Sequence, residues 1–166
     1  MAETTSAGGL TRPPDDGDLA GLARELNRLG ARYIVIGGVA INRLGFIRAT
    51  EDLDLLIARD LANQALVKKA LEILPDKAVR ELGKEDLAAW VVVRVNDAIT
   101  VDLMTEASGI GYAAAESQIE WEEIGGVRIP FASAELMLRF KQGSRDKDRM
   151  DRQFLEERQR QPKPKE

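Results

Sequence analysis

Apolar residues recur with two different periods along this chain, and the change of period predicts a mixture of helices and strands. Leucines three or four residues apart near the start indicate an amphipathic helix that Asp18 caps and Gly30 ends. Runs rich in Val, Ile and Leu indicate short strands. The expected helices cover 18–30, 39–44, 61–73, 134–141 and 145–158, and the expected strands cover 33–36, 52–57, 89–95, 98–104, 120–124 and 127–131. This order predicts an α+β fold, in which helices pack on a mixed β-sheet and two helices come last.

Two short connections are expected to be β-hairpin turns. Asn96-Asp97 separates two β-rich runs, and a two-residue connection of this kind suits a tight hairpin. Gly125-Gly126 separates two later runs in the same way. Residues 76–87 are charged and poorly periodic, so we expect a loop with at most a short turn of helix there.

The length of the chain and its apolar content fit a single folded domain. The chain has 166 residues, of which 44% are hydrophobic. Residues 1–17 and 159–166 have little apolar surface, so we expect flexible segments on either side of a domain at 18–158. No apolar stretch approaches the roughly 18 residues that span a bilayer, and the N-terminus has no signal-peptide pattern. We therefore expect a cytoplasmic protein.

The residue types present restrict the chemistry that the chain can perform. It contains no cysteine and no histidine, which excludes disulfides, thiolate zinc sites, cysteine nucleophiles and Ser-His-Asp triads. The net charge of −4 argues against a broad surface for binding nucleic-acid duplexes without regard to sequence. Any catalysis must therefore use carboxylates, Lys, Arg, Ser, Thr or a metal ion.

Three aspartates lie in the expected strands. Asp52 and Asp54 project from the same face of their strand, because residues two apart in a strand point the same way. Asp102 interrupts the apolar strand 98–104. Clustered carboxylates raise one another's pKa, and a divalent cation such as Mg²⁺ relieves this repulsion. The pattern predicts a two-metal site for phosphoryl transfer, whereas the alternative is three separate structural roles at a strand entrance, in an ion pair and on an exposed edge.

A glycine pair precedes these aspartates and follows an expected strand. Gly37 and Gly38 have no side chains, so a triphosphate can approach their backbone closely. The better-known phosphate loops are absent. A Gly-x-Gly-x-x-Gly frame that starts at Gly37 meets Val39 and Asn42, and a P-loop frame that starts at Gly38 meets Arg43. This disfavours dinucleotide binding and P-loop hydrolysis.

Two arginines flank the expected phosphate site. The guanidinium groups of Arg43 and Arg48 suit two-point binding of phosphate oxygens. The alternative is that both are solvated loop charges, which contribute little. The sequence leaves these two interpretations open.

These motifs together resemble a known family. The Gly37-Gly38 pair, the Asp52-x-Asp54 element and the lone Asp102 are similar to the pattern of minimal nucleotidyltransferases of the DNA polymerase beta superfamily. Further segments resemble stand-alone bacterial and archaeal members related to AbiEii-type abortive-infection toxins. These segments are Arg48-x-Thr50-x-Asp52-x-Asp54, Ile124-Gly-Gly-Val-Arg-Ile129, and Lys141 with Arg145-x-Lys147-Asp148. The resemblance covers about residues 18–155.

The resemblance implies a polymerase-beta-like nucleotidyltransferase fold and a set of site residues. It implies that the three aspartates bind Mg²⁺ or Mn²⁺, and that the glycine pair approaches the phosphates of an NTP. It also places Thr50, Lys141, Lys147 and Asp148 near the nucleotide. One departure is that many members have Ser as the second residue of the pair, whereas Gly38 offers no hydroxyl group.

The leading hypothesis is metal-dependent transfer of a nucleoside monophosphate from an NTP to a hydroxyl group, with release of pyrophosphate. Asp102 is the first choice for the base that accepts the hydroxyl proton. The acceptor, which the sequence leaves open, is a tRNA end or other RNA, a partner protein or a small molecule.

Two other functions compete with this one. The first is a non-catalytic member of a toxin-antitoxin or phage-defence pair that keeps the fold to bind a partner. The second is an aspartate-nucleophile phosphatase, which shares an Asp-x-Asp element. That element follows a hydrophobic strand in such phosphatases, whereas Ala49-Thr50-Glu51 precedes it here, so the phosphatase ranks last.

Overall fold

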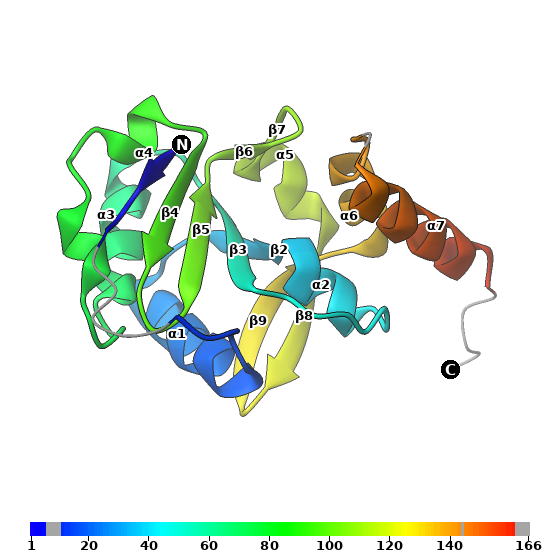
Figure 1. Ribbon diagram of the computed structural model, residues 1–166, viewed down its shortest axis with the longest axis horizontal. Helices are drawn as coiled ribbons and strands as arrows, with labels where there is room; N and C mark the ends of the chain where they lie inside the picture. The colour runs from blue at the N-terminus through cyan, green and yellow to red at the C-terminus, as the bar shows by residue number, and fades with distance from the viewer. Residues whose placement is uncertain (6–10, 144, 162–166) are drawn as a thin grey trace.

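The computed structural model describes residues 1–5, 11–143 and 145–161, which fold around one mixed sheet (Figure 1). The strands are β1 (Ala2–Glu3), β2 (Tyr33–Ile36), β3 (Asp52–Ile57), β4 (Val92–Asn96), β5 (Thr100–Met104), β6 (Glu106–Ala107), β7 (Ile110–Gly111), β8 (Ile119–Ile124) and β9 (Val127–Ala132). The α-helices are α1 (Asp16–Leu29), α2 (Gly37–Arg43), α3 (Leu61–Leu71), α4 (Asp86–Ala89), α5 (Tyr112–Ala115), α6 (Ala134–Phe140) and α7 (Asp146–Arg160). Two short 3₁₀ helices are η1 (Ala78–Glu81) and η2 (Glu116–Gln118).

The main sheet has the strand order β1-β4-β5-β3-β2-β9-β8. The pairs β3–β5, β2–β9 and β1–β4 are parallel, and the pairs β2–β3, β4–β5 and β8–β9 are antiparallel. β6 and β7 form a separate two-stranded ribbon. The mixed sheet predicted from the sequence is confirmed, and it places β3 at the centre between β5 and β2.

The two faces of β3 have different roles. Leu53 and Leu55 are fully buried in the core, and Leu53 lies near Leu19 of α1. Each such side chain contributes roughly 1.5–3 kcal/mol when it leaves water. Asp52 and Asp54 project from the other face, because successive side chains alternate. Figure 1 shows α6 and α7 together at one end of the molecule, next to α2 and away from α3 and α4. The core thus fixes a strand whose polar side remains available.

The first long helix begins earlier than the sequence predicted. Asp15, rather than Asp18, is its N-cap, and the two side chains form a reciprocal capping box. Asp18 is the third residue of the helix, and its carboxylate accepts hydrogen bonds from the backbone N–H of Asp15 and from Arg12. The expected C-terminal end is confirmed, since Gly30 has the left-handed conformation, with φ 73°.

The expected two-residue turn at Asn96-Asp97 is wrong. Asn96 belongs to β4 and pairs with Thr100, so the connection is 97–99. The Asp97 carboxylate explains the wider turn, because it accepts hydrogen bonds from the backbone N–H groups of Asp76, Ala78 and Ala98. Asp97 therefore joins the hairpin to the preceding loop instead of forming a tight turn.

The strand expected at 89–95 starts later than predicted. Residues 86–89 form α4, and β4 begins only at Val92. The expected hairpin around Gly125-Gly126 is confirmed, with β8 and β9 as its arms. Ser133 caps α6 as predicted, and its hydroxyl accepts a hydrogen bond from the N–H of Leu136.

The first residues pair with the edge of the sheet, within the segment 1–17 that was expected to be flexible. Ala2 and Glu3 pair with β4 as β1, and Thr4 is 2% exposed. The hydroxyl of Thr4 accepts a hydrogen bond from the N–H of Asn96. This segment satisfies the backbone groups along the edge of β4, which would otherwise be exposed. Parts of the predicted flexible segments, residues 6–10 and 162–166, lie outside the described residues.

In residues 1–5, 11–143 and 145–161, no helix combines the length and the apolar character needed to cross a membrane.

Candidate functional site

The three predicted aspartates meet on one face of the sheet. β3 and β5 are parallel neighbours, and their register places Asp54 directly beside Asp102. Asp52 lies two residues earlier on the same face of β3. One carboxylate oxygen from each of the three residues lies within 4.8 Å of the other two. The convergence predicted from strand alternation is therefore present in the structure.

Local structure at the glycine pair makes room for this cluster. Gly37 has φ 70°, a left-handed conformation that other residues rarely adopt. A Cβ atom at this position would lie 1.9 Å from Asp54 Oδ2. A Cβ atom at Gly38 would lie 2.4 Å from Cγ2 of Thr50. The pair thus allows the Asp54 carboxylate and the Thr50 side chain to pack directly against the backbone that follows β2.

The cluster carries strong like-charge repulsion. Burial raises the pKa of Asp54 to about 7, and the neighbouring carboxylates of Asp102 and Asp52 act in the same direction. Burial and Asp102 also raise the pKa of Asp52, while Arg94 opposes the shift. All three side chains offer oxygen ligands, which hard divalent cations such as Mg²⁺ prefer. The donor set and its excess negative charge both fit a divalent cation.

A residue that the sequence analysis did not select, Arg94, contacts this cluster. Its Nε donates to Asp102 Oδ1 at 2.9 Å, and its Nη2 donates to Asp102 Oδ2 at 3.0 Å. The same Nη2 donates to Asp52 Oδ2 at 3.2 Å. The hydrogen bonds and charge of Asp102 raise the pKa of Arg94 above its usual range, so the guanidinium remains charged. Arg94 is thus the internal counter-ion of the trio.

Two cavities adjoin Asp54, and most of the other predicted site residues line them. The larger one, of about 390 Å³, is lined by Gly38, Arg48, Ala49, Thr50, Glu51, Asp52, Asp54 and Lys147. The smaller one, of about 180 Å³, includes Gly37, Asp54, Lys141, Arg145 and Asp148 in its lining. The structure therefore brings the glycine pair, Asp52 and the predicted residues Lys141, Lys147 and Asp148 into the lining of two cavities that share Asp54.

Buried ion pairs attach α7 to the site. Asp151 of α7 is fully buried, and its Oδ2 lies 3.0 Å from Arg48 Nη2 and 3.2 Å from Lys141 Nζ. Lys141 also lies 3.6 Å from Asp148, whose carboxylate accepts two hydrogen bonds from Arg145. These contacts lower the pKa of Asp148, mainly through Arg145. Asp151 was not predicted, and its position in a charged helix gives no sign of burial.

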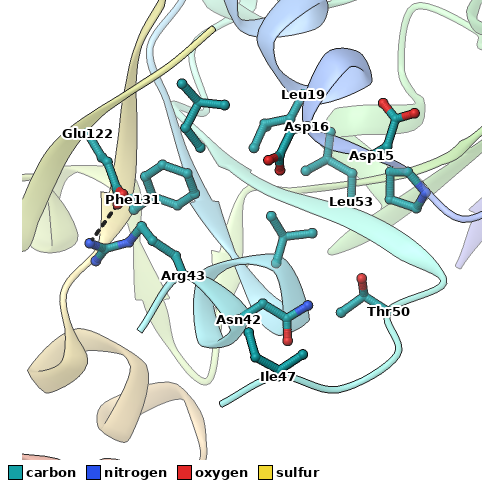
Figure 2. Close-up of a pocket in the computed structure, with 13 residues that line it drawn as sticks. Asp15, Asp16, Leu19, Asn42, Arg43, Ile47, Thr50, Leu53, Glu122 and Phe131 are labelled. Atoms are coloured by element: carbon teal, nitrogen blue, oxygen red, sulfur yellow. Dashed lines mark hydrogen bonds and ion pairs between the residues drawn. The ribbon is translucent and has the colours of Figure 1, made fainter. Parts of the chain in front are cut away.

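Arg43 lies apart from the aspartates. It lines a different cavity, of about 380 Å³, between α1, α2 and the β8–β9 hairpin. Its guanidinium contacts Glu120 at 2.9 Å and Glu122 at 3.2 Å, and it stacks over the ring of Phe131. Figure 2 shows this pairing with Glu122, and it shows Thr50, which lines both this cavity and the larger one beside Asp54. Arg43 lines neither of the two cavities that adjoin Asp54.

Comparison with known proteins supports the fold. No known protein family matches the chain, and no curated protein matches it. Among solved structures, a "putative nucleotidyltransferase" from Thermotoga maritima aligns with a TM-score of 0.52 and 15% identity, over 84% of this chain and 91% of that chain. This chain has a nucleotidyltransferase fold. An "antigenic nucleotidyltransferase-like protein" from Paracoccidioides brasiliensis aligns with a TM-score of 0.47 and 22% identity, over 84% of this chain and 74% of that chain.

Within this nucleotidyltransferase fold, the main omission of the sequence analysis is Arg94. The sequence contains a signal for it, which is the alternation of Arg94 with the apolar residues Val93 and Val95. Both valines are fully buried in the structure. A charged residue between two buried ones in a strand projects from the opposite face. That is the face of Asp102, as the strand register shows.

Proposed function

We propose that the protein transfers a nucleoside monophosphate from an NTP to a hydroxyl group, with release of pyrophosphate. The observation that carries this proposal is the register of β3 and β5, which places Asp54 beside Asp102 with Asp52 in reach of both. These three residues would hold Mg²⁺ or Mn²⁺. A bound cation supplies stabilisation of the negative charge that develops on the phosphate oxygens.

The proposed position of the nucleotide is in the two cavities that adjoin Asp54. Lys147 and Arg48 line the larger cavity, and Lys141 lines the smaller one. Cationic side chains around an acidic metal site suit a triphosphate, because they bind the oxygens that the metal does not. The glycine pair supports this site indirectly, because the space that a side chain would fill at Gly37 and Gly38 is taken by Asp54 and Thr50, which line the larger cavity. Arg43 is left out of the proposed nucleotide site, because it is paired with glutamates in another cavity.

The proposed reaction forms one P–O bond and breaks another. The acceptor oxygen attacks the α-phosphorus, and the bond from that phosphorus to the oxygen bridging the β-phosphorus breaks, so that pyrophosphate leaves. The hydroxyl proton goes to a carboxylate oxygen of Asp102. Both oxygens of Asp102 accept hydrogen bonds from Arg94 in the structure. Each of these oxygens has a further lone pair that can accept the hydroxyl proton.

The test is a transfer assay with each α-labelled NTP and Mg²⁺ or Mn²⁺, using total RNA, cellular protein and small polyols as acceptors. We expect the wild-type protein to label one class of acceptor and to release pyrophosphate. Asp54→Asn should abolish the labelling, because it removes a central ligand. Glu25→Gln, which removes one carboxylate of an exposed ion pair on α1, should have no effect.

The pH dependence of the same assay adds a second criterion. A protonated carboxylic acid is a poor cation ligand, and burial raises the pKa of Asp54 to about 7. Cation binding and transfer should therefore increase as the pH rises through about 7. Wild-type labelling that equals that of Asp54→Asn, or labelling of no acceptor at any pH, would contradict the proposed function.

A second candidate function is a non-catalytic partner in a toxin-antitoxin or phage-defence pair, as the resemblance to AbiEii-type proteins suggests. Arg94 favours this alternative, because it neutralises part of the acidic cluster and lets the fold exist without a metal ion. Calorimetry with Mg²⁺ and each NTP separates the two functions. A folded protein that binds no nucleotide but binds the product of a neighbouring gene would support the non-catalytic partner.

A further inference from the structure

The guanidinium group of Arg94 binds Asp102 and Asp52, which are two of the three proposed cation ligands. It occupies both oxygens of Asp102 and one oxygen of Asp52, with three donor–acceptor distances between 2.9 and 3.2 Å. Asp102 is largely buried, and its side chain is 9% exposed, so few other directions of approach are open. A cation of the protein itself therefore already binds these two carboxylates.

The strand register explains why this contact forms. Arg94 on β4 is paired with Asp102 on β5, and Asp102 is paired with Asp54 on β3. Paired residues on adjacent strands project from the same face, so the three side chains form one row across the sheet. The next residue in the row, on the outer side of Arg94, is Glu3 of β1. Arg94 thus has a carboxylate neighbour on each side.

The exposure of these side chains differs along the row. The Arg94 side chain is 32% exposed, so it has room to turn away from the cluster. Asp102 is buried on β5, an inner strand of the sheet. If Arg94 moved toward Glu3, it would exchange the carboxylate of Asp102 for that of Glu3. This exchange would reduce the free-energy cost of breaking its contact with Asp102.

We propose that Arg94 is a competing counter-cation of the metal site, and that a divalent cation must displace its guanidinium from Asp102 in order to bind. This inference rests on the proposed function, because it assigns the trio to a metal ion. It adds one step to metal binding, which is the release of Arg94 from Asp102. Without a metal ion, Arg94 neutralises part of the negative charge of the trio, and entry of the cation releases Arg94 from Asp102.

The physical reason for competition is that the two cations share the same ligands. Like charges that contact one carboxylate repel each other strongly in a partly buried site, where the effective dielectric constant is low. The two-point contact of a guanidinium also uses both oxygens of the Asp102 carboxylate, which reduces its ability to bind a second cation. Binding of metal and retention of the Arg94 contact are therefore opposed.

The test is calorimetric titration of the metal-free protein with Mg²⁺, and separately with Mn²⁺, in the absence of nucleotide. We expect Arg94→Gln to bind the metal about tenfold more tightly than the wild type, within the roughly 5- to 150-fold range typical of coupled binding events. The midpoint of thermal unfolding of metal-free Arg94→Gln should fall, because the trio loses its counter-charge. A merely structural Arg94 would give weaker metal binding together with lower stability.

Arg28→Gln is the matched control. It removes an arginine that forms a two-point pair with Glu25 on the exposed surface of α1, and it should leave metal affinity unchanged. A second measurement uses the wild-type protein and does not depend on the folding of a variant. The NMR signal of the Arg94 Nε–H, bonded to Asp102, should shift and exchange faster with water as Mg²⁺ is added.

The outcomes separate this inference from the proposed function. Equal or weaker metal binding by folded Arg94→Gln, or an Nε–H signal unchanged at saturating Mg²⁺, would overturn the role of Arg94. Wild-type protein that binds Mg²⁺ through Asp54 but labels no acceptor would overturn nucleotidyl transfer and leave the competition intact. Absence of metal binding in both the wild type and Arg94→Gln would overturn both.

Discussion

Gly37 and the Asp54 carboxylate share a space that has no room for a further carbon atom. The Cβ of any other residue at position 37 would lie 1.9 Å from Asp54 Oδ2, and the backbone there is left-handed. From the sequence, Gly37 was expected to let a phosphate group approach the backbone closely. The structure adds a second role, which is to allow Asp54 to point into the site.

Gly37→Ala should therefore lose metal binding as well as stability. The left-handed backbone alone costs about 1–2 kcal/mol for a residue with a Cβ. The clash with Asp54 should add to this loss and displace the carboxylate. Thermal unfolding and calorimetric titration with Mn²⁺ measure the two effects.

Gly30→Ala is the control for this change. Gly30 has nearly the same backbone conformation, with φ 73°, but a Cβ added there would have no neighbouring atom within 4 Å. It should lose stability through the backbone alone and keep metal affinity. Equal metal affinity in both alanine variants would contradict the role given to Gly37.

At the scale of elements, the wrong length expected for the turn between β4 and β5 is the reason why the contact between Arg94 and Asp102 was not predicted. The expected two-residue turn pairs Val95 with Ala98, and the same register places Val91 opposite Asp102. In the structure the connection is longer, and Arg94 takes that position. The sequence could not reveal the difference, because it depends on hydrogen bonds from the distant backbone of Asp76 and Ala78 to Asp97.

The strands that carry the aspartates were predictable for a local reason. The bounds of β2 follow from a continuous apolar run, and in β3 the alternation of aspartate and leucine fixed the faces of Asp52 and Asp54. The ion pairs of α7 were not predictable in this way. They join Arg48, Lys141 and Asp151, which are far apart in sequence, and only the packing of α7 on α6 brings them together.

Asp151→Ala should detach α7 from the site. Removing one partner of a buried ion pair costs about 3–5 kcal/mol, because Arg48 would lose its anion and Lys141 would keep only Asp148. Urea denaturation should show this loss, and hydrogen exchange should increase along α7. The Arg48 guanidinium should also move, which would weaken NTP binding.

Asp146→Ala on the same helix is the matched control. Asp146 pairs with Arg149 at an exposed position, so its removal should cost less than about 1 kcal/mol. If Asp151→Ala were as stable as Asp146→Ala and α7 kept its protection from exchange, the proposed attachment of α7 would be wrong.

At the scale of the whole molecule, apolar periodicity predicted the mixed sheet and the order of its longer elements. The nucleotidyltransferase fold was implied by the resemblance of the motifs to a known family. The position of β1 was not accessible, since a polar two-residue strand has no apolar signal and forms only through the edge of β4. The same edge places Glu3 beside Arg94, so the first residues of the chain extend the row of charges at the site.

The central claim, that Asp52, Asp54 and Asp102 together hold a divalent cation, is tested most directly by crystallography with Mn²⁺ and a non-hydrolysable NTP analogue. Anomalous difference maps locate Mn²⁺ directly, because the signal comes from the metal itself. We expect a peak within ligand distance of all three carboxylates, with Arg94 turned away from Asp102. Crystals at saturating Mn²⁺ with no peak there, and with Arg94 still bound to Asp102, would contradict it.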